Sequence, residues 1–413
     1  LGTAQDDLRI EGGISADESP DVVPESLHTF FCENGEVLGH LVIDSSIGGL
    51  SGGGIRMVPG TSVKELCYLA RAMTWKYAFL QWPYGGAKAG IAVPSGDLTA
   101  QHRQERIELF ARRLAAFRGR YMPGEDAGTN TDDLNLIRRI AHLDRAGPRS
   151  LDSSFHTALT LRICAEQIMR ELKLDPANST AAIEGFGKVG GWVARQLREI
   201  GCRVVAVSTC KGAIHHADGL DIDRLLQARE SHGDDCVAQY KGARRIERER
   251  LLSVQADLLV PCALSWSVTS ANVDEIQARA ILCGANNPVT EKAKGILAAK
   301  GVLYFPDFVS NSGGVLGSII ETLCMDRQKA AGVLREVFEP KVQCVFSRAK
   351  DMGQSLEAAA KEIATENRRR MQQRAETVGG KPSSWLGAAY QHGLLPRRLV
   401  KMFGASYIRK VMT

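Results

Sequence analysis

The sequence contains no apolar segment of about 18 residues, the length that a membrane-spanning helix requires. Residues 1–20 lack a basic stretch followed by an apolar one, so they do not have the pattern of a secretory signal. The formal net charge is only +5 over 413 residues, which gives no reason to expect a strongly charged partner. We therefore expect a cytoplasmic protein with no membrane partner.

No two of the ten cysteines have the C-x-x-C spacing, and most lie inside apolar stretches. This pattern is typical of buried free thiols in a reducing compartment. His215 and His216 precede Asp218 and Gly219, which favours a solvated turn over a pair of metal ligands. Because the other candidate ligands do not cluster, the sequence predicts no metal site.

The first third of the chain mixes strand and helix patterns. Residues 27–45 alternate apolar and polar around Asn34-Gly35, which predicts two strands joined by a turn. Residues 63–80 and 101–118 carry apolar side chains at helical spacing. Between them, the Gly-rich residues 85–90 are expected to form a loop.

From Thr157 onward, short strands alternate with helices, which predicts a parallel sheet with crossover helices. The expected strands are residues 180–184, 203–208, 257–261, 280–283 and 301–305. After about residue 318 the pattern is helical to about residue 375, and a basic amphipathic segment lies near the C-terminus.

A dinucleotide fingerprint stands between the first two of these strands. Gly185-Phe186-Gly187-Lys188-Val189-Gly190 has the G-x-G-x-x-G spacing, follows a strand and opens a helix closed by Gly201. The first glycine permits the turn, the second lets the backbone approach a pyrophosphate, and the third lets helix and strand pack closely. The helix N-terminus then faces the phosphates. A structural glycine turn in another α/β fold is the alternative.

The end of the next strand bears on the choice of cofactor. It reads Val207-Ser208-Thr209-Cys210-Lys211, without the carboxylate that usually grips the ribose of NAD. Ser208, Thr209 and Lys211 would tolerate a 2′-phosphate, so we expect NADP, or both NADP and NAD. The alternative is that Lys211 is a solvated turn residue.

Three ionisable side chains could carry an amino acid deamination. Such a reaction needs a cation for the α-carboxylate, a group that polarises the carbonyl or imine, and an acid or base for the amine proton. Lys76, Lys88 and Asp126 could supply these roles. Partial desolvation of Lys88 would lower its pKa.

These residues belong to a series of motifs. The series is Gly53 to Arg56, Met73 to Lys76, Pro83 to Gly90, Glu125 to Thr129, Gly185 to Gly190, Gly284 to Pro288 and Pro306 to Val315. In order and spacing, over residues 27–320, it resembles the glutamate/leucine/phenylalanine/valine dehydrogenase superfamily. The departures are Lys188 where the family often has Asn, no Gly after Thr157, and Thr209 where an Asp often ends the strand.

The resemblance implies an α/β, two-domain amino acid dehydrogenase fold, an NAD- or NADP-dependent enzyme and a homo-oligomer. Residues 1–150 would form the α/β substrate-binding and oligomerisation domain, and residues 151–320 the Rossmann-like dinucleotide-binding domain. Residues 321–378 would be C-terminal helices that pack back to complete the substrate domain. Residues 379–413 form a basic tail of unknown role, for which packing on the protein is favoured over nucleic acid binding.

The resemblance also implies roles for single residues. Lys76 would bind the substrate α-carboxylate, Lys88 would be the catalytic lysine, and Asp126 would shuttle the amine proton. Thr157, Asn286 and Asn311 would position the nicotinamide. A non-catalytic, nucleotide-binding or metabolite-sensing relative is the alternative from another class, against which the retention of Lys76, Lys88 and Asp126 together argues.

Two positions bear on the substrate. Glutamate-specific relatives carry a Lys just before the Gly-Gly pair that matches Gly53, where this chain has Gly52. A serine that helps glutamate enzymes is retained as Ser318. Because a buried carboxylate without a partner is costly, the loss of the lysine outweighs the retained hydroxyl. We expect a neutral aliphatic amino acid, with glutamate as the alternative.

Overall fold

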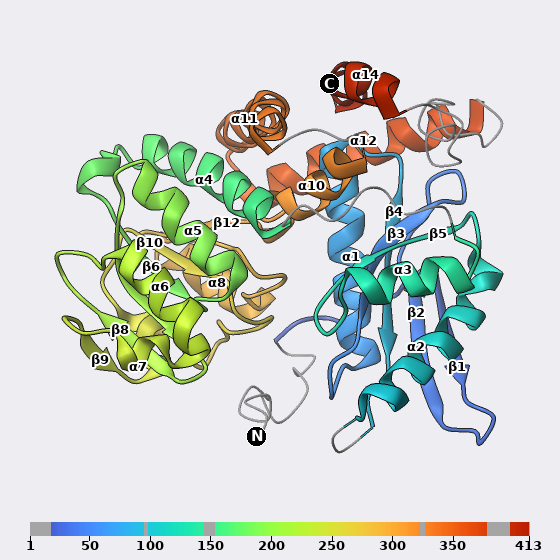
Figure 1. Cartoon of the computed structure of the whole chain (residues 1–413). Coiled ribbons are helices and arrows are strands. Elements are labelled where there is room, and N and C mark those ends of the chain that lie inside the picture. The colour runs from blue at the N-terminus through green and yellow to red at the C-terminus, as the bar shows by residue number, and fades with distance from the viewer. Residues whose placement is uncertain (1–17, 95–97, 144–152, 323–326, 378–396, 413) are drawn as a thin grey trace. The chain divides into compact units, whose positions relative to one another are not determined.

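The computed structural model describes residues 18–94, 98–143, 153–322, 327–377 and 397–412 (Figure 1). Its contacts divide the chain into two compact units, which we describe separately. Unit 1 comprises residues 1–20, 152–317 and 334–360, and unit 2 comprises residues 21–151, 318–333 and 361–413. No helix of the described part has both the length and the apolar character needed to cross a membrane.

Unit 2 is built on a five-stranded sheet of order β1-β2-β4-β3-β5. The strands are β1 (Ser26–Phe31), β2 (Val37–Ile43), β3 (Ser51–Arg56), β4 (Gly85–Ile91) and β5 (Tyr121–Glu125). The predicted hairpin is confirmed, since β1 and β2 pair antiparallel and Gly35 between them has φ +84°. β3 runs parallel to both β4 and β5, which places the ends of these three strands at one edge.

Helices cover both faces of this sheet (Figure 1). They are α1 (Val63–Leu80) on one face and α2 (Ala100–Leu114) and α3 (Thr131–Ile140) on the other. Successive side chains of β2 point to opposite faces of the sheet, and Leu41 and Ile43 join the core under α2 and α3. Val42 points the opposite way and packs on Leu66 of α1. Ser62 caps α1 by accepting a hydrogen bond from the Glu65 N–H.

The Gly-rich segment 85–90 is not the loop that the sequence suggested; that prediction was wrong. It is β4, buried along its whole length. Its glycines serve close packing, since a Cβ atom at Gly86 would lie 2.1 Å from the Thr74 amide nitrogen on α1. A Cβ atom at Gly85 would lie 2.0 Å from the Ser45 carbonyl oxygen. A run of glycines therefore permits a strand to lie directly under a helix.

Unit 1 is built on a seven-stranded sheet of order β12-β11-β10-β6-β7-β8-β9. The strands are β6 (Thr180–Glu184), β7 (Arg203–Thr209), β8 (Gly212–His215), β9 (Arg244–Ile246), β10 (Leu258–Pro261), β11 (Ala280–Leu282) and β12 (Leu303–Phe305). The predicted parallel pairing holds from β12 to β7. β8 and β9 are antiparallel additions that the sequence did not predict, and a two-residue turn at Cys210-Lys211 leads into them.

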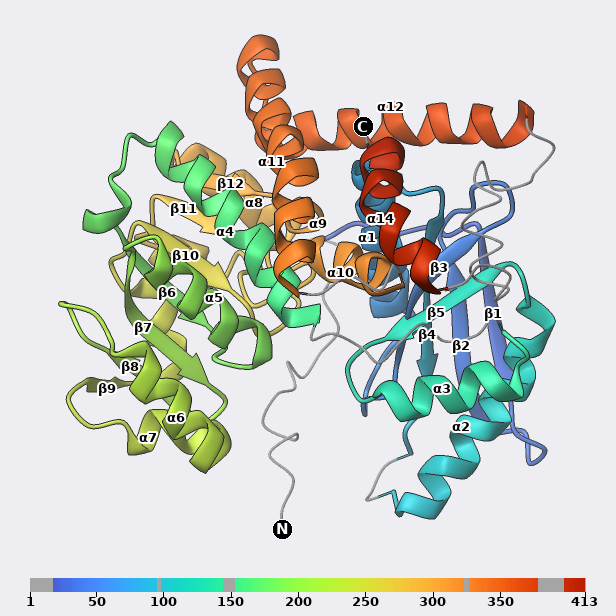
Figure 2. The ribbon, with the colours of Figure 1, turned by 45° about the horizontal axis from the view of Figure 1, so that its top comes forward.

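The helices of this sheet lie on two faces. α4 (Ser153–Glu171) and α5 (Lys188–Glu199) pack together on one face, and α8 (Glu291–Ala299) lies on the other (Figure 2). The remaining helices of residues 222–239 and 307–310 are α6 (Ile222–His232), α7 (Cys236–Gln239) and α9 (Asp307–Ser310). This is the doubly wound arrangement that presents the carboxyl ends of parallel strands to a ligand.

The helical C-terminal part predicted from the sequence is confirmed. It contains α10 (Gly313–Thr322), α11 (Arg327–Met352), α12 (Leu356–Thr377) and α14 (Arg397–Met412). The basic segment α14 is amphipathic as expected, and it buries Ala405, Ile408 and Met412. Its Tyr407 ring packs edge-on against Trp82 within unit 2.

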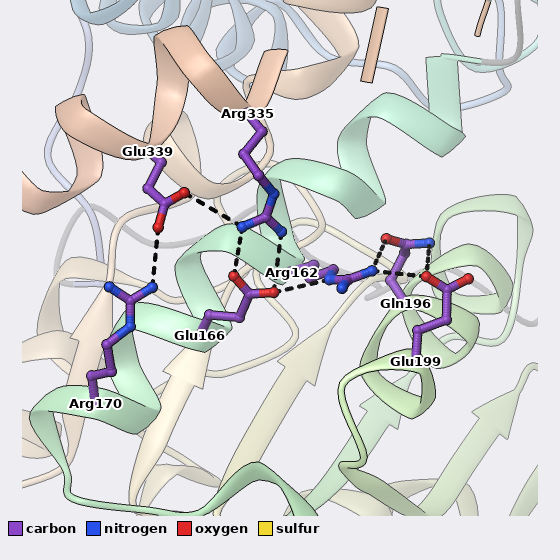
Figure 3. A network of polar contacts seen from close by, with 7 residues as sticks. All are labelled: Arg162, Glu166, Arg170, Gln196, Glu199, Arg335 and Glu339. Atoms are coloured by element: carbon purple, nitrogen blue, oxygen red, sulfur yellow. Dashed lines mark hydrogen bonds and ion pairs between the residues drawn. The ribbon is translucent and has the colours of Figure 1, made fainter. Parts of the chain in front are cut away.

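A network of ion pairs fastens the unit 1 part of α11 to α4 (Figure 3). Arg335 on α11 reaches Glu166 on α4 at 2.8 Å and also pairs with Glu339. Glu166 in turn accepts from Arg162 at 2.9 Å, and Arg162 pairs with Glu199 on α5. A shared network of this kind fixes three helices more firmly than isolated surface pairs would.

Candidate active site

In unit 2 the ends of β3 and β5 and the middle of β4, between the two adjacent strands β2 and β3, bring together a cluster of buried charges. The Nζ atom of Lys88, on β4, lies 3.0 Å from Oδ2 of Asp126, which follows β5. The same oxygen accepts from Nε of Arg56, the last residue of β3, at 2.7 Å. Arg56 also pairs with Glu65 on α1. The Lys88 side chain is only 5% exposed and that of Asp126 is 15% exposed.

Two glycines of β3 create the space for this cluster. A Cβ atom at Gly54 would lie 2.8 Å from the Asp126 Cβ and 3.2 Å from the Lys88 Nζ. A Cβ atom at Gly53 would lie 1.7 Å from the Ala87 carbonyl oxygen, which no side chain can tolerate. Gly53 is therefore required for β3 to lie against the β4 backbone, and Gly54 leaves room for the Lys88–Asp126 pair.

The surroundings of the cluster shift its protonation equilibria. Burial lowers the pKa of Lys88, and the charge of Asp126 offsets part of that shift. Burial alone would raise the pKa of Asp126, but the charges of Lys88 and Arg56 hold it well below its usual range. Lys88 is thus easier to deprotonate than a surface lysine, while Asp126 is held as an anion whose lowered pKa makes it a weaker base than an isolated carboxylate. A lysine of lowered pKa beside a carboxylate provides two groups that can exchange protons with an amine.

The other predicted substrate residues lie on α1, β3 and α10. Lys76 is buried on α1, which packs against β4. Gly52 lies on β3, and a Cβ atom there would meet the Tyr77 hydroxyl at 2.7 Å and the Tyr84 ring at 3.3 Å. Ser318 lies on α10, and its side chain is outside the described part of the structure.

In unit 1 the fingerprint has the geometry that the sequence predicts. Gly185 has φ +88°, and a Cβ atom at Gly190 would lie 2.0 Å from the Gly185 carbonyl oxygen. Gly187 caps α5, and a Cβ atom there would point into open space. Lys188 and Val189 begin α5, with Lys188 exposed. The open N-terminus beside Gly187 suits the pyrophosphate of NAD or NADP.

The hydroxyls at the end of β7 have internal roles. Ser208 is buried, and its Oγ accepts from the Gly185 N–H at 3.1 Å, while its carbonyl accepts from the Phe186 N–H. Thr209 Oγ1 donates to the Asp234 carbonyl at 2.7 Å and accepts from the Lys211 N–H. Both hydroxyls therefore shape the turn around the fingerprint, a role that the sequence did not suggest. Phe186 itself is a core residue.

The residues expected near the nicotinamide gather at the end of β11 and the start of α10. Asn311 Nδ2 donates to Ala285 O at 2.8 Å and to Asn286 Oδ1 at 3.1 Å. Asn311 Oδ1 is buried and accepts no hydrogen bond within the described residues. Thr157 on α4 donates to Ser153 O, and a Cβ atom at Gly314 would lie 3.1 Å from its Oγ1. An unsatisfied amide oxygen suits the carboxamide of a nicotinamide.

Comparisons with known proteins agree with this geometry. Residues 150–375 match the family model "Glutamate/Leucine/Phenylalanine/Valine dehydrogenase", and residues 33–141 match "Glu/Leu/Phe/Val dehydrogenase, dimerisation domain". The chain belongs to this family. Its activity is that of an amino acid dehydrogenase, and its cofactor is NAD or NADP.

Relatives of this amino acid dehydrogenase include the glutamate dehydrogenase of Thermotoga maritima, 34% identical over 285 residues, 65% of this chain and 68% of that one. The glutamate dehydrogenase of Aeropyrum pernix is 31% identical over 288 residues, again 65% of this chain and 68% of the relative. Among solved structures, the hetero-hexameric glutamate dehydrogenase from Thermus thermophilus has a TM-score of 0.71 at 26% identity, covering 87% of this chain and 91% of that one. The L-tryptophan dehydrogenase from Nostoc punctiforme, 24% identical, shares the fold with a TM-score of 0.61, covering 84% of this chain and 96% of that one.

The predictions of family, fold class and enzyme class are confirmed by these matches. Arg56 and Glu65 were not predicted as site residues. Arg56 stands in the Gly53 to Arg56 motif, which was a usable signal, whereas nothing near Glu65 points to a partner 9 residues away. In the described part of the chain no cluster of metal-ligating side chains occurs.

Glu184, the last residue of β6, is expected to make stability depend on pH. Burial raises its pKa to about 7, although its carboxylate accepts from the Ser267 hydroxyl at 2.9 Å. An acid whose pKa is higher in the folded state binds more protons there, so the free energy of unfolding falls as pH rises from about 4.5 to about 7. We expect Glu184→Gln to lack this pH dependence, so that its stability relative to wild type is greater at pH 8 than at pH 5 by on the order of 3 kcal/mol.

Thermal unfolding of both proteins at the two pH values checks this expectation. Glu275→Gln, at an exposed position, is the control and should leave the pH dependence unchanged. An identical pH dependence in wild type and Glu184→Gln would contradict the role assigned to Glu184.

Proposed function

We propose that this chain catalyses the reversible oxidative deamination of an L-amino acid to its 2-oxo acid and ammonia. The observation that carries the proposal is the buried pairing of Lys88 with Asp126 at 3.0 Å. When bound, NAD or NADP would serve as the acceptor of the hydride. The homo-oligomer and cytoplasmic location expected from the sequence are part of the proposal, and the match to a dimerisation domain supports the former.

The chemistry assigned to unit 2 divides among three side chains. Lys76 binds the substrate α-carboxylate through its charge. Asp126, an anion at neutral pH, accepts the amine proton and later returns it to the leaving ammonia. Lys88, with its lowered pKa, takes a proton from the water that adds to the imine, and in its charged form it stabilises the oxygen of the developing carbonyl.

In unit 1 the fingerprint and Asn311 are the groups assigned to the dinucleotide. The N-terminus of α5 beside Gly187 would hold the pyrophosphate, and Asn311 Oδ1 would accept from the carboxamide of the nicotinamide. Thr157 and Asn286 would help to position the ring. We propose that NADP, or both cofactors, are accepted, because β7 itself ends without a carboxylate.

The alternative is a relative that binds nucleotides or metabolites without turnover. The Lys88–Asp126 pair argues against it, because two buried charges are costly to retain where they do no chemistry. Assaying the formation of reduced dinucleotide with a panel of L-amino acids separates the two. Binding of dinucleotide without reduction by any amino acid would favour the non-catalytic relative.

For the substrate we propose a neutral aliphatic amino acid. Gly52 offers no charge to a side-chain carboxylate. The rings of Tyr77 and Tyr84 border this position and pack edge to face, with their centroids 5.7 Å apart. Because neither tyrosine carries a charge, these neighbours favour an apolar side chain over a carboxylate, which would lose its hydration without a partner. Glutamate, the substrate named for several relatives, is the alternative.

Introducing a lysine at position 52 should shift the preference toward glutamate. Tyr77→Phe first removes the hydroxyl that a Cβ atom at position 52 would meet. Relative to Tyr77→Phe alone, Gly52→Lys should raise kcat/KM for glutamate over leucine by about tenfold or more, about 1.4 kcal/mol. Gly52→Met in the same background matches the length without the charge and should not do so. Efficient wild-type turnover of glutamate, with leucine and valine inert, would contradict the proposed substrate class.

A further inference from the structure

The end of β7 is where a dinucleotide fold recognises the adenosine ribose, and here the chain brings a carboxylate to it from a distant segment. β7 ends at Thr209, and the turn Cys210-Lys211 follows. Asp234, 25 residues beyond Thr209, lies against this turn. Its carbonyl accepts from the Thr209 hydroxyl at 2.7 Å, and its Oδ2 accepts from the Cys210 thiol at 3.4 Å.

Local structure explains how Asp234 reaches this place. α6 ends at His232, and Gly233 caps it with φ +57°, a conformation that favours glycine. The next residues form a short 3₁₀ turn, Gly233–Asp235, which carries Asp234 back toward the β7 end. The carboxylate that the fold usually places on the second strand is thus supplied by the segment after α6.

The charge of Asp234 is compensated by a neighbour on α6. Arg229 donates from Nη1 to Asp234 Oδ1 at 2.5 Å. The pair is partly exposed, at 29% for the Arg229 side chain and 41% for that of Asp234, so both groups are accessible to a ligand. Lys211 in the turn adds a second cation to the same neighbourhood.

We infer that the Arg229–Asp234 ion pair sets the choice between NAD and NADP. The inference rests on the proposed binding of a dinucleotide at the fingerprint. Asp234 can accept a hydrogen bond from a ribose hydroxyl and repels a 2′-phosphate. Arg229 attracts a 2′-phosphate, and while it is paired it limits the repulsion by Asp234. The balance of the two charges lets the chain accept both cofactors.

Neutralising Asp234 and neutralising Arg229 should therefore shift the cofactor preference in opposite directions. Asp234→Asn keeps the size and the backbone contact to Thr209, but it removes the anion and releases Arg229 toward a 2′-phosphate. Arg229→Gln leaves Asp234 as an anion without its partner and so disfavours a 2′-phosphate. A purely structural ion pair would instead weaken both cofactors alike in either variant.

Binding of two adenosine fragments tests this without relying on turnover. Calorimetric titration of the full chain with 2′,5′-ADP and with 5′-AMP gives the ratio of their dissociation constants. We expect Asp234→Asn to shift this ratio toward 2′,5′-ADP by about tenfold, and Arg229→Gln to shift it toward 5′-AMP by about tenfold. Asp235→Asn, an exposed neighbour of the same charge, is the control and should leave the ratio unchanged.

Ratios that stay within about twofold in both variants, or that move in the same direction, would overturn the inference. Where one variant does not fold, the other decides, since each has its own expected sign. A wild-type chain that binds neither fragment would overturn the proposed dinucleotide site, and this inference with it. Wild-type binding with unchanged ratios in the variants would overturn the role of the ion pair alone.

Discussion

Replacing Lys88 with alanine should remove at least about 3 kcal/mol of transition-state stabilisation, roughly a hundredfold in kcat, from a chain that still folds. The fold should survive because Asp126 keeps its contact with Arg56 at 2.7 Å, so no buried anion is left without a partner. The loss is expected because, in the proposed mechanism, the charged and uncharged forms of Lys88 both take part in the reaction. Steady-state kinetics and thermal unfolding on the same preparation measure the two effects separately.

Two further variants sharpen this expectation. Lys88→Met fills the space of the lysine chain without its charge and should be as inactive as Lys88→Ala, which excludes a cavity as the cause. Lys241→Ala, at an exposed position, should be fully active. A folded Lys88→Ala chain with nearly normal kcat would show that Lys88 is not the catalytic lysine.

The second large effect should follow Asp126→Asn, with a loss of activity comparable to that of Lys88→Ala. An amide cannot accept the amine proton, so the base is lost although the shape is retained. The substitution also removes the main contribution that raises the pKa of Lys88 against its burial. We therefore expect the limb of the pH profile that reports Lys88 to move to lower pH in the residual activity.

The pH profile distinguishes this role from a merely structural one. Asp132→Asn, at an exposed position on the first turn of α3, should leave both kcat and the profile unchanged. Full activity of Asp126→Asn would show that another group accepts the proton. Lost activity in a folded chain, with an unshifted profile, would contradict the coupling of Asp126 to Lys88.

Much of the scaffold could be predicted from local patterns. The hairpin around Gly35, the amphipathic helix of residues 63–80 and the fingerprint at residues 185–190 each carry their signal within a short window. The structure agrees with all three. Local patterns suffice there because turn geometry, helical spacing and strand-to-helix turns depend on residues adjacent in sequence.

The failures concern features fixed by distant segments. Residues 85–90 resemble a loop because of their glycines, yet those glycines allow β4 to pass beneath α1. Arg56 meets Asp126 only because the parallel strands β3 and β5 end at one edge, and it meets Glu65 across to α1. Asp234 reaches the end of β7 through the turn after α6. These contacts join residues that are distant in sequence, so they cannot be predicted until the order and pairing of the strands are known.

We propose that this chain couples the oxidation of an L-amino acid at Lys88 and Asp126 to the reduction of NAD or NADP. The most direct measurement follows the reduced dinucleotide and the ammonia released when wild type or Lys88→Ala is supplied with L-leucine, L-valine or L-glutamate. We predict that wild type forms both products in equal amounts, with a neutral aliphatic substrate preferred, and that Lys88→Ala forms neither at a comparable rate. A pure, folded wild-type chain that binds dinucleotide but forms no reduced dinucleotide with any L-amino acid would contradict the account.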